Sequence, residues 1–191
     1  GILFWLSELK SRYELLVDRM PLSAVKDWHV GEFEIARPDR QFFRVLGVEV
    51  VIENREVTSW CQPLVEPMQE GICAFIYKRI NGISHFLVQA KIECGNFDVV
   101  ELAPTVQCLT GPYKGESTVP YFVDYVLSNK YKRVLFDTKQ SEEGGRFYHE
   151  QNRQLVVEAD DDFPNVPPEN YMWLTLGQIK ELLRYNNYLN I

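Results

Sequence analysis

Alternation of apolar and polar residues predicts a strand over residues 85–93, near the middle of the chain. One face of this strand would carry Leu87, Gln89, Lys91 and Glu93. The other face would be apolar, with Val88, Ala90 and Ile92. Burying polar groups without partners costs about 2–7 kcal/mol each. The polar face is therefore expected either to be solvated or to line a pocket.

The same pattern predicts a β-hairpin just before this face. Residues 72–80 alternate as a strand, and Asn81-Gly82 separates them from 83–93. Asn-Gly tolerates the positive φ angles of a type I′ turn, which fixes the register of an antiparallel pair. Further strands are expected at 41–52, 57–64, 98–103, 133–138 and 155–158, with Pro63 limiting the pairing of the second of these.

Helical periodicity appears at both ends of the chain. Residues 2–17 form an expected amphipathic helix that Pro21 stops, and Ser23 can cap a short turn after it. A helix is expected to begin near Pro120. Thr175 and Gln178 fit a capping box that starts a last helix. Loops are expected at 109–118, 140–145 and 160–170, whereas 146–153 fits either a helix or a strand.

Size and composition limit the function classes. The 191 residues suit a single domain over 1–191 with an N-terminal helical extension at about 1–28. The net charge of −7 argues against a nucleic-acid binder. No run of 18 apolar residues predicts a membrane span, and no signal peptide is evident. The separated cysteines suggest reduced thiols in a cytoplasmic protein, and the scattered histidines argue against a zinc site.

Several catalytic motifs are missing from the sequence. There is no G-x-S-x-G, no G-x-G-x-x-G and no phosphate-binding P-loop. The order of elements is compatible with an α+β, Nudix-like sandwich, in which a mixed and mostly antiparallel sheet is flanked by helices. The R-E-x-x-E-E box of Nudix hydrolases is absent, which disfavours a magnesium site and diphosphate hydrolysis.

What remains is a set of polar residues on or beside the expected strands. They are Gln62, Gln89, Lys91, Glu93, Glu101, Gln107, Gln140, Ser141, Glu142, Arg146, Asn152 and Arg153. The aromatic residues Trp60, Tyr113 and Trp173 could stack on a base or a sugar, and Lys91, Lys114, Arg146 and Arg153 could contact a diphosphate. Each residue taken singly also fits a surface or capping role.

Several ordered motifs resemble the NDP-hexose 2,3-dehydratase family. The segment 86–107 contains FLVQAKIE, Gly95-Asn96 and ELAPTVQ, the last of which includes Thr105. Residues 57–64 resemble a W-x-Q-P element, and 173–178 resemble W-L-T-L-G-Q. The stretch 134–158, with Gln140-Ser141-Glu142 and Asn152-Arg153, resembles a D-x-x-Q-S-E-x-G…N-R…V-V-E block. The resemblance covers about residues 20–190.

The resemblance implies a Nudix-like fold without the hydrolase box. Members usually carry two such modules in tandem, whereas this chain holds one. Two copies could pair as a homodimer, or the chain could be a fragment of a longer protein. The loop Gly111-Pro112-Tyr113-Lys114 also departs from the family's usual Asn-Tyr-Thr-Arg, which puts its phosphate contacts in doubt.

The resemblance also implies loss of water from a nucleotide-linked 4-keto-6-deoxyhexose, such as a dTDP-sugar. A base removes the C3 proton, which is acidified by the C4 carbonyl, and the C2 hydroxyl leaves with help from an acid. A separate 3-ketoreductase would trap the diketo product, and neither a redox cofactor nor a metal is required. Candidate bases are Glu101, Glu93 and Glu142, while Lys91 or Tyr113 could act as donor or acid.

For each carboxylate, a structural salt bridge with Lys91 or Arg153 is the alternative. The expected substrate-binding residues are Trp60, Gln62, Gln89, Asn96, Thr105, Gln107, Lys114, Gln140, Ser141, Arg146, Asn152, Arg153 and Trp173. The alternative function for the whole chain is a non-catalytic nucleotide-sugar-binding or regulatory module.

Overall fold

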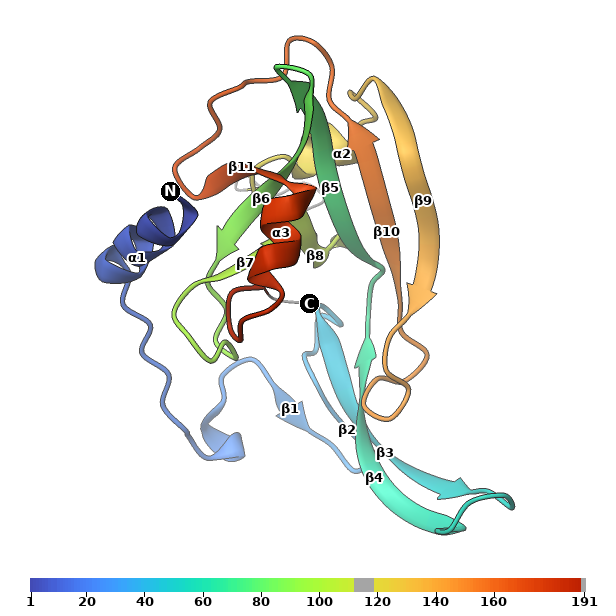
Figure 1. Cartoon of the computed structure of the whole chain (residues 1–191). Coiled ribbons are helices and arrows are strands. Elements are labelled where there is room, and N and C mark those ends of the chain that lie inside the picture. The colour runs from blue at the N-terminus through green and yellow to red at the C-terminus, as the bar shows by residue number, and fades with distance from the viewer. Residues whose placement is uncertain (112–118, 190–191) are drawn as a thin grey trace.

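The computed structural model describes residues 1–111 and 119–189 and contains two β-sheets (Figure 1). A four-stranded antiparallel sheet has the order β1 (His29–Val30), β2 (Glu34–Ala36), β3 (Phe43–Val51) and β4 (Ser59–Pro67). The larger sheet has seven strands: β5 (Gly71–Ile80), β6 (Ile83–Lys91), β7 (Glu101–Pro104), β8 (Val106–Leu109), β9 (Arg133–Ser141), β10 (Gln151–Glu158) and β11 (Tyr171–Thr175).

Within residues 1–111 and 119–189 the helices are few and short: α1 (Ile2–Arg12), the 3-10 turn η1 (Leu22–Ala24), α2 (Val123–Leu127) and α3 (Leu176–Leu182). Together with the mixed sheet they confirm the predicted α+β class. The predicted capping box is present, because Thr175 Oγ1 accepts from the Gln178 N–H and Gln178 Oε1 accepts from the Thr175 N–H. In the described residues, no helix has the length and apolar character needed to cross a bilayer.

The larger sheet is built on the predicted hairpin. Ile80 pairs with Ile83, and the intervening Asn81 and Gly82 have φ angles of 51° and 77°. These values confirm the type I′ turn. On its other side β5 pairs in parallel with β10, which in turn pairs antiparallel with the edge strand β9. Residues distant in sequence are thereby placed next to β5.

The hairpin strands separate at Thr105, which forms a fork in the sheet. Beyond this point β6 pairs with β7, whereas β5 pairs with β8, a strand that the sequence pattern did not predict. The Thr105 side chain is fully buried. Its hydroxyl accepts from the Ile76 N–H at 2.9 Å and donates to the Leu87 carbonyl oxygen at 2.5 Å. One side chain thus holds both strands where their own ladder ends.

Two apolar clusters cover opposite faces of the larger sheet. One includes Ile76 and Leu87 and packs against α2, while the other includes Val88 and Leu102 and packs against α1 and α3. The predicted polar face of β6 is therefore wrong at its start, because Leu87 is as buried as Val88. A central strand covered on both faces needs apolar residues on both.

Other boundaries also differ from the predictions. The first helix ends at Arg12 rather than 17: Leu6 and Leu9 are buried in a core, against which Ile2 and Trp5 also pack, whereas Leu16 is 80% exposed. Gln140 and Ser141 belong to β9 rather than to a loop, since they pair with Asn152 and Gln151.

The pairing of β4 also corrects a prediction. Pro63 does not limit pairing, because it pairs with Gly47 in β3. Two residues on, Val65 bonds outward to Arg146 and Tyr148. Backbone groups two residues apart in a strand point in the same direction, so the nitrogen of Pro63 also points away from β3. The missing N–H of Pro63 therefore removes no hydrogen bond between β4 and β3.

Candidate functional site

A cavity of about 790 Å³ lies on the α3 side of the larger sheet, where the strands fork. Phe75, Val88 and Leu102 form an apolar wall, which α3 extends with Ile179 and Leu183. The other walls are polar and come from the end of β6, from β8, β9 and β10, and from the segment that joins the last two. Apolar walls with a few convergent polar groups are typical of small-molecule sites.

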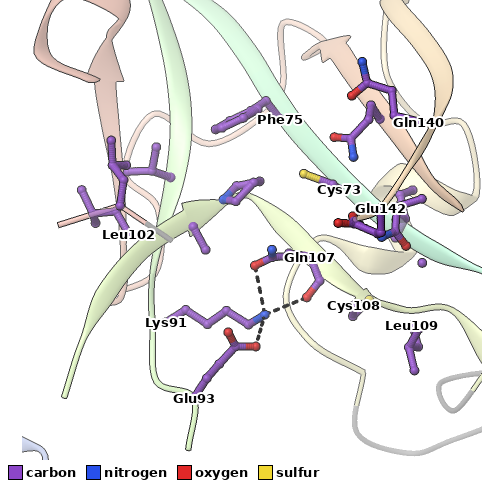
Figure 2. A pocket seen from close by; sticks show the side chains of 18 of the residues that line it. Cys73, Phe75, Lys91, Glu93, Leu102, Gln107, Cys108, Leu109, Gln140 and Glu142 are labelled. Atoms are coloured by element: carbon purple, nitrogen blue, oxygen red, sulfur yellow. Dashed lines mark hydrogen bonds and ion pairs between the residues drawn. The ribbon is translucent and has the colours of Figure 1, made fainter. Parts of the chain in front are cut away.

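One polar wall is organised around the Lys91 ammonium (Figure 2). Its Nζ donates to the carbonyl oxygen and to Oε1 of Gln107, at 3.0 and 3.2 Å, and lies 2.6 Å from Oε1 of Glu93. The Lys91 side chain is only 18% exposed. An ammonium has three N–H donors, and these contacts occupy all of them. A ligand would reach Lys91 by replacing one of these contacts.

The opposite wall carries two carboxylates that share one amide. Asn152 Nδ2 donates to Oε1 of Glu142 at 2.7 Å and lies 3.4 Å from Oε1 of Glu150. The Glu142 N–H also bonds to the Glu150 carbonyl oxygen at 3.0 Å, which closes the loop between β9 and β10. In the described part of the chain, Glu142 forms no ion pair with a cation, so a neutral group holds this carboxylate.

The parallel pairing of β5 and β10 makes room for this amide. Asn152 pairs with Gly71, and a Cβ atom on Gly71 would lie 1.8 Å from Asn152 Oδ1. Gly71 thus has a steric role, since it leaves the space that the Asn152 side chain fills. Glycine at such a position allows close approach of a neighbouring strand's side chain.

Charges from both walls act on Cys73, which lines the cavity between them (Figure 2). Burial raises the pKa of the Cys73 thiol; the Glu142 charge raises it further, and Lys91 acts in the opposite direction. Burial likewise raises the pKa of Glu150, with the neighbouring Glu142 charge adding to the effect and the Asn152 hydrogen bond opposing it. The cavity thus contains a carboxyl group biased toward its neutral form.

Seven residues of the sequence-derived set line this cavity together: Lys91, Glu93, Gln107, Gln140, Ser141, Glu142 and Asn152. Gln89 and Thr105 line a second cavity of about 370 Å³, to which Lys91 and Gln107 also contribute. Glu101 pairs with Lys91 across β6 and β7 and is 8% exposed, but it lines neither cavity. Asn96 donates to the Lys91 carbonyl oxygen at 3.4 Å.

The remaining expected residues lie elsewhere. Trp60 donates to Gln62 at 2.6 Å, and Gln62 donates to the Gly145 carbonyl oxygen at 2.7 Å, so they tie β4 to the loop after β9. Arg153 forms a two-bond salt bridge with Asp137, at 2.8 and 2.7 Å.

Two further residues of the expected set make contacts with aromatic rings. Arg146 lies over the Phe147 ring, and Trp173 packs edge-on against Phe163 in the α2-side core. Tyr113 and Lys114 fall outside the described residues, so the structure does not place these two.

The residues of the cavity that sequence reasoning missed include Gly71, Cys73, Glu150 and Gln154. A signal existed for Glu150, because it lies two residues before Asn152 and period-two alternation would put both on one face. No such signal existed for Gly71, since its role depends on the parallel pairing with β10, which joins segments about eighty residues apart.

The donor set of the cavity suits proton transfer to and from a polar organic ligand. It offers an ammonium, neutral amides and three carboxylates, one of which has a raised pKa. Paired carboxyl groups in different protonation states can act as base and acid in one site. In the described residues, no group of three or more His, Cys, Asp or Glu side chains is arranged to hold a metal ion.

Solved structures overlap only part of the chain. A C. elegans Ap4A hydrolase overlaps 61% of this chain and 87% of its own, with 12% identity and a TM-score of 0.40. An ADP compounds hydrolase overlaps 76% of this chain and 77% of its own, with 17% identity and a TM-score of 0.46. Similarity at this level carries no conclusion about the site.

Sequence relatives are much closer. Three proteins named dTDP-4-dehydro-6-deoxy-alpha-D-glucopyranose 2,3-dehydratase are similar to this chain. The protein of Saccharopolyspora spinosa is 44% identical over 98% of this chain and 39% of its own length. Those of Streptomyces violaceoruber and Amycolatopsis orientalis are 43% and 41% identical over the whole chain, and over 43% and 40% of their own lengths. The chain thus spans about two fifths of the length of these relatives.

The family profile described as NDP-hexose 2,3-dehydratase matches residues 1–191. The match runs through both walls of the cavity, from Lys91 to Asn152. On this evidence the chain belongs to the NDP-hexose 2,3-dehydratase family.

Proposed function

We propose that the cavity binds a nucleotide-linked 4-keto-6-deoxyhexose, with dTDP as the nucleotide, and eliminates water across C2 and C3 of the sugar. The observation that supports this most is the convergence of Lys91 and Glu142 on one cavity from opposite walls. The family assignment and the names of the relatives supply the substrate class.

Glu142 is the base in this proposal. It removes the proton from C3, which is acidic because the carbonyl at C4 stabilises the resulting enolate. Glu93 is a weaker candidate, because its carboxylate already lies 2.6 Å from the Lys91 ammonium. This contact keeps the Glu93 carboxylate on the Lys91 wall, where it holds the ammonium in place.

Lys91 stabilises the charge that develops on O4. The substrate oxygen takes the place of Gln107 Oε1, the longer of the two Gln107 contacts. The ammonium remains held by the Gln107 carbonyl oxygen and Glu93, and a preorganised donor of this kind favours the enolate over the ketone. Gln140, Gln154 and Ser141 line the same cavity and supply amide and hydroxyl partners for the sugar.

The active unit in this proposal is a homodimer in the cytoplasm. A separate ketoreductase reduces the diketo product. A non-catalytic binding module is the second candidate, favoured by one observation: protein groups engage all three N–H donors of Lys91.

The test is incubation of this chain with dTDP-4-keto-6-deoxyglucose in D₂O, with and without a 3-ketoreductase and NADPH. Deuterium at C3 of recovered substrate, or a 2-deoxy product in the coupled reaction, is expected from the dehydratase. Saturable binding without either signal would leave the binding module as the function. A reaction without protein measures spontaneous exchange beside the ketone.

A further inference from the structure

We propose that Glu150 is the general acid that protonates the departing C2 hydroxyl. This assignment rests on the proposed dehydration and adds a residue to it. The elimination needs a proton donor beside the base, and Lys91 lies on the opposite wall with Glu93 and Gln107 (Figure 2).

Glu150 lies beside the proposed base and lines the same cavity. Glu142 and Glu150 both line the cavity, and Asn152 Nδ2 lies 2.7 and 3.4 Å from their Oε1 atoms. A shared donor keeps the two carboxyl groups beside each other and facing the same ligand. A base and an acid so placed can reach adjacent carbon atoms of one sugar ring.

The stereochemistry of the sugar also favours an acid on the wall that carries the base. In a ring of the gluco configuration, which the relatives' names specify, the C3 hydrogen and the C2 hydroxyl project from the same face. A single wall can therefore take the proton from C3 and give one to the C2 oxygen. Proton transfer requires each group to come within hydrogen-bond reach of its atom, and neighbouring carboxyls on one wall can satisfy both demands together.

The pKa of Glu150 is shifted in the direction that an acid needs. Burial raises the pKa of Glu150, and the Glu142 charge raises it further. A raised pKa means that Glu150 keeps its proton to higher pH than an ordinary glutamic acid does. Glu142 accepts the shorter hydrogen bond from Asn152, at 2.7 Å, and in this assignment it is the group that takes the C3 proton.

The proton balance closes over the cycle. Glu142 takes the C3 proton, and the electrons of that bond form an enolate on C3, C4 and O4. The enolate collapses to a C2=C3 double bond as the C2–O bond breaks, and the Glu150 proton completes the leaving water. Glu142 then delivers its proton to C2, and the C3 enol proton returns to Glu150. The products are water and a 3,4-diketo sugar.

The test compares Glu150→Gln, Glu142→Gln and a control, Glu143→Gln, in the two assays described above. Glu143 neighbours Glu142, but its side chain is 69% exposed and lies outside the lining of this cavity. For Glu150→Gln we expect loss of 2-deoxy product by roughly 10²–10⁴-fold, while C3 deuterium exchange continues, because exchange needs only the base. Glu142→Gln should lose both signals, and the control should lose neither.

The pH profile gives an independent measurement. An acid must be protonated to act, so kcat/KM of the unmodified chain should fall as pH rises through the raised pKa of Glu150. That falling limb should be absent from the residual activity of Glu150→Gln and present in Glu143→Gln.

Two results would overturn the assignment while the dehydration stands. One is product formation by Glu150→Gln within about threefold of the unmodified chain. The other is loss of both exchange and product in a Glu150→Gln chain whose unfolding temperature equals that of the unmodified chain. This would mean that Glu150 maintains the shape of the site and is not the acid. An unmodified chain that neither exchanges nor eliminates would instead refute the proposed function, and the acid assignment with it.

Discussion

The two polar walls of the cavity hold their carboxylates by different means. On one wall Glu93 contacts the Lys91 ammonium at 2.6 Å, whereas on the other Glu142 and Glu150 share the neutral amide of Asn152. The Lys91 ammonium engages Glu93 in an ion pair, which keeps that carboxylate beside the cation. The Asn152 amide orients its two carboxylates by hydrogen bonds alone. In the proposed mechanism, the identity of the holding group separates a supporting carboxylate from a reactive one.

The largest test of this contrast exchanges the two carboxylates for amides, one at a time. Glu142→Gln should lower kcat/KM for the dehydration by roughly 10²–10⁴-fold, because it removes the base. Glu93→Gln should cost no more than about tenfold, because Lys91 keeps its contact with the Gln107 carbonyl oxygen when the substrate binds. The measurement is the initial rate in the coupled ketoreductase assay. Equal losses in the two variants would contradict the contrast.

A smaller effect should follow from filling the space beneath Asn152. In Gly71→Ala the new methyl group would lie 1.8 Å from Asn152 Oδ1, so the amide must turn away from Glu142 and Glu150. We expect kcat/KM to fall about tenfold, since orientation is lost while both carboxylates remain. The unfolding free energy should change by only about 1 kcal/mol, because the clash involves the end of a side chain.

Gly47→Ala is the matched control for this substitution. Gly47 is also a strand glycine, but a Cβ there meets nothing within 4 Å. It should leave both the rate and the thermal unfolding unchanged. Unaltered kinetics in Gly71→Ala would show that the Asn152 amide does not organise the carboxylates.

The smallest expected effect is on the reactivity of Cys73. Its pKa is raised by burial and by Glu142 and lowered by Lys91, so the two walls act on it with opposite sign. Because the thiolate is the reactive form, alkylation should be slower than at exposed Cys61 and should increase with pH. Glu142→Gln should speed alkylation of Cys73 at pH 8 by about threefold, and Lys91→Met should slow it.

Peptide mass spectrometry after timed exposure to iodoacetamide measures each cysteine separately. The exposed Cys61 serves as an internal control, and its rate should be the same in all variants. If neither substitution changes the alkylation rate of Cys73, the charges of the two walls do not act on this thiol.

Local signals in the sequence predicted local structure well. The Asn81-Gly82 turn and the Thr175 capping box are confirmed, because each depends on residues within four positions of one another. The strand β8 was missed because Val106–Leu109 is too short for a clear alternation, and its existence depends on the fork at Thr105.

The candidate site was predictable to the extent that motifs bring its residues together in sequence. The runs around Lys91 and around Gln140 to Glu142 were singled out, and both line the cavity. Which face each strand turns to the cavity was not predictable. It depends on the packing of α3 against one side and on the parallel β5–β10 pairing, neither of which leaves a periodic mark.

The fork at Thr105 has a consequence for how a ligand would be received. A hydroxyl buried between two strands, and bonded to both, cannot let either ladder shift without exposing a backbone group to an apolar surrounding. The separation of the strands at the fork is therefore fixed by the protein itself. An incoming sugar would meet a shape already made, and little of its binding energy would be spent on rearranging the strands.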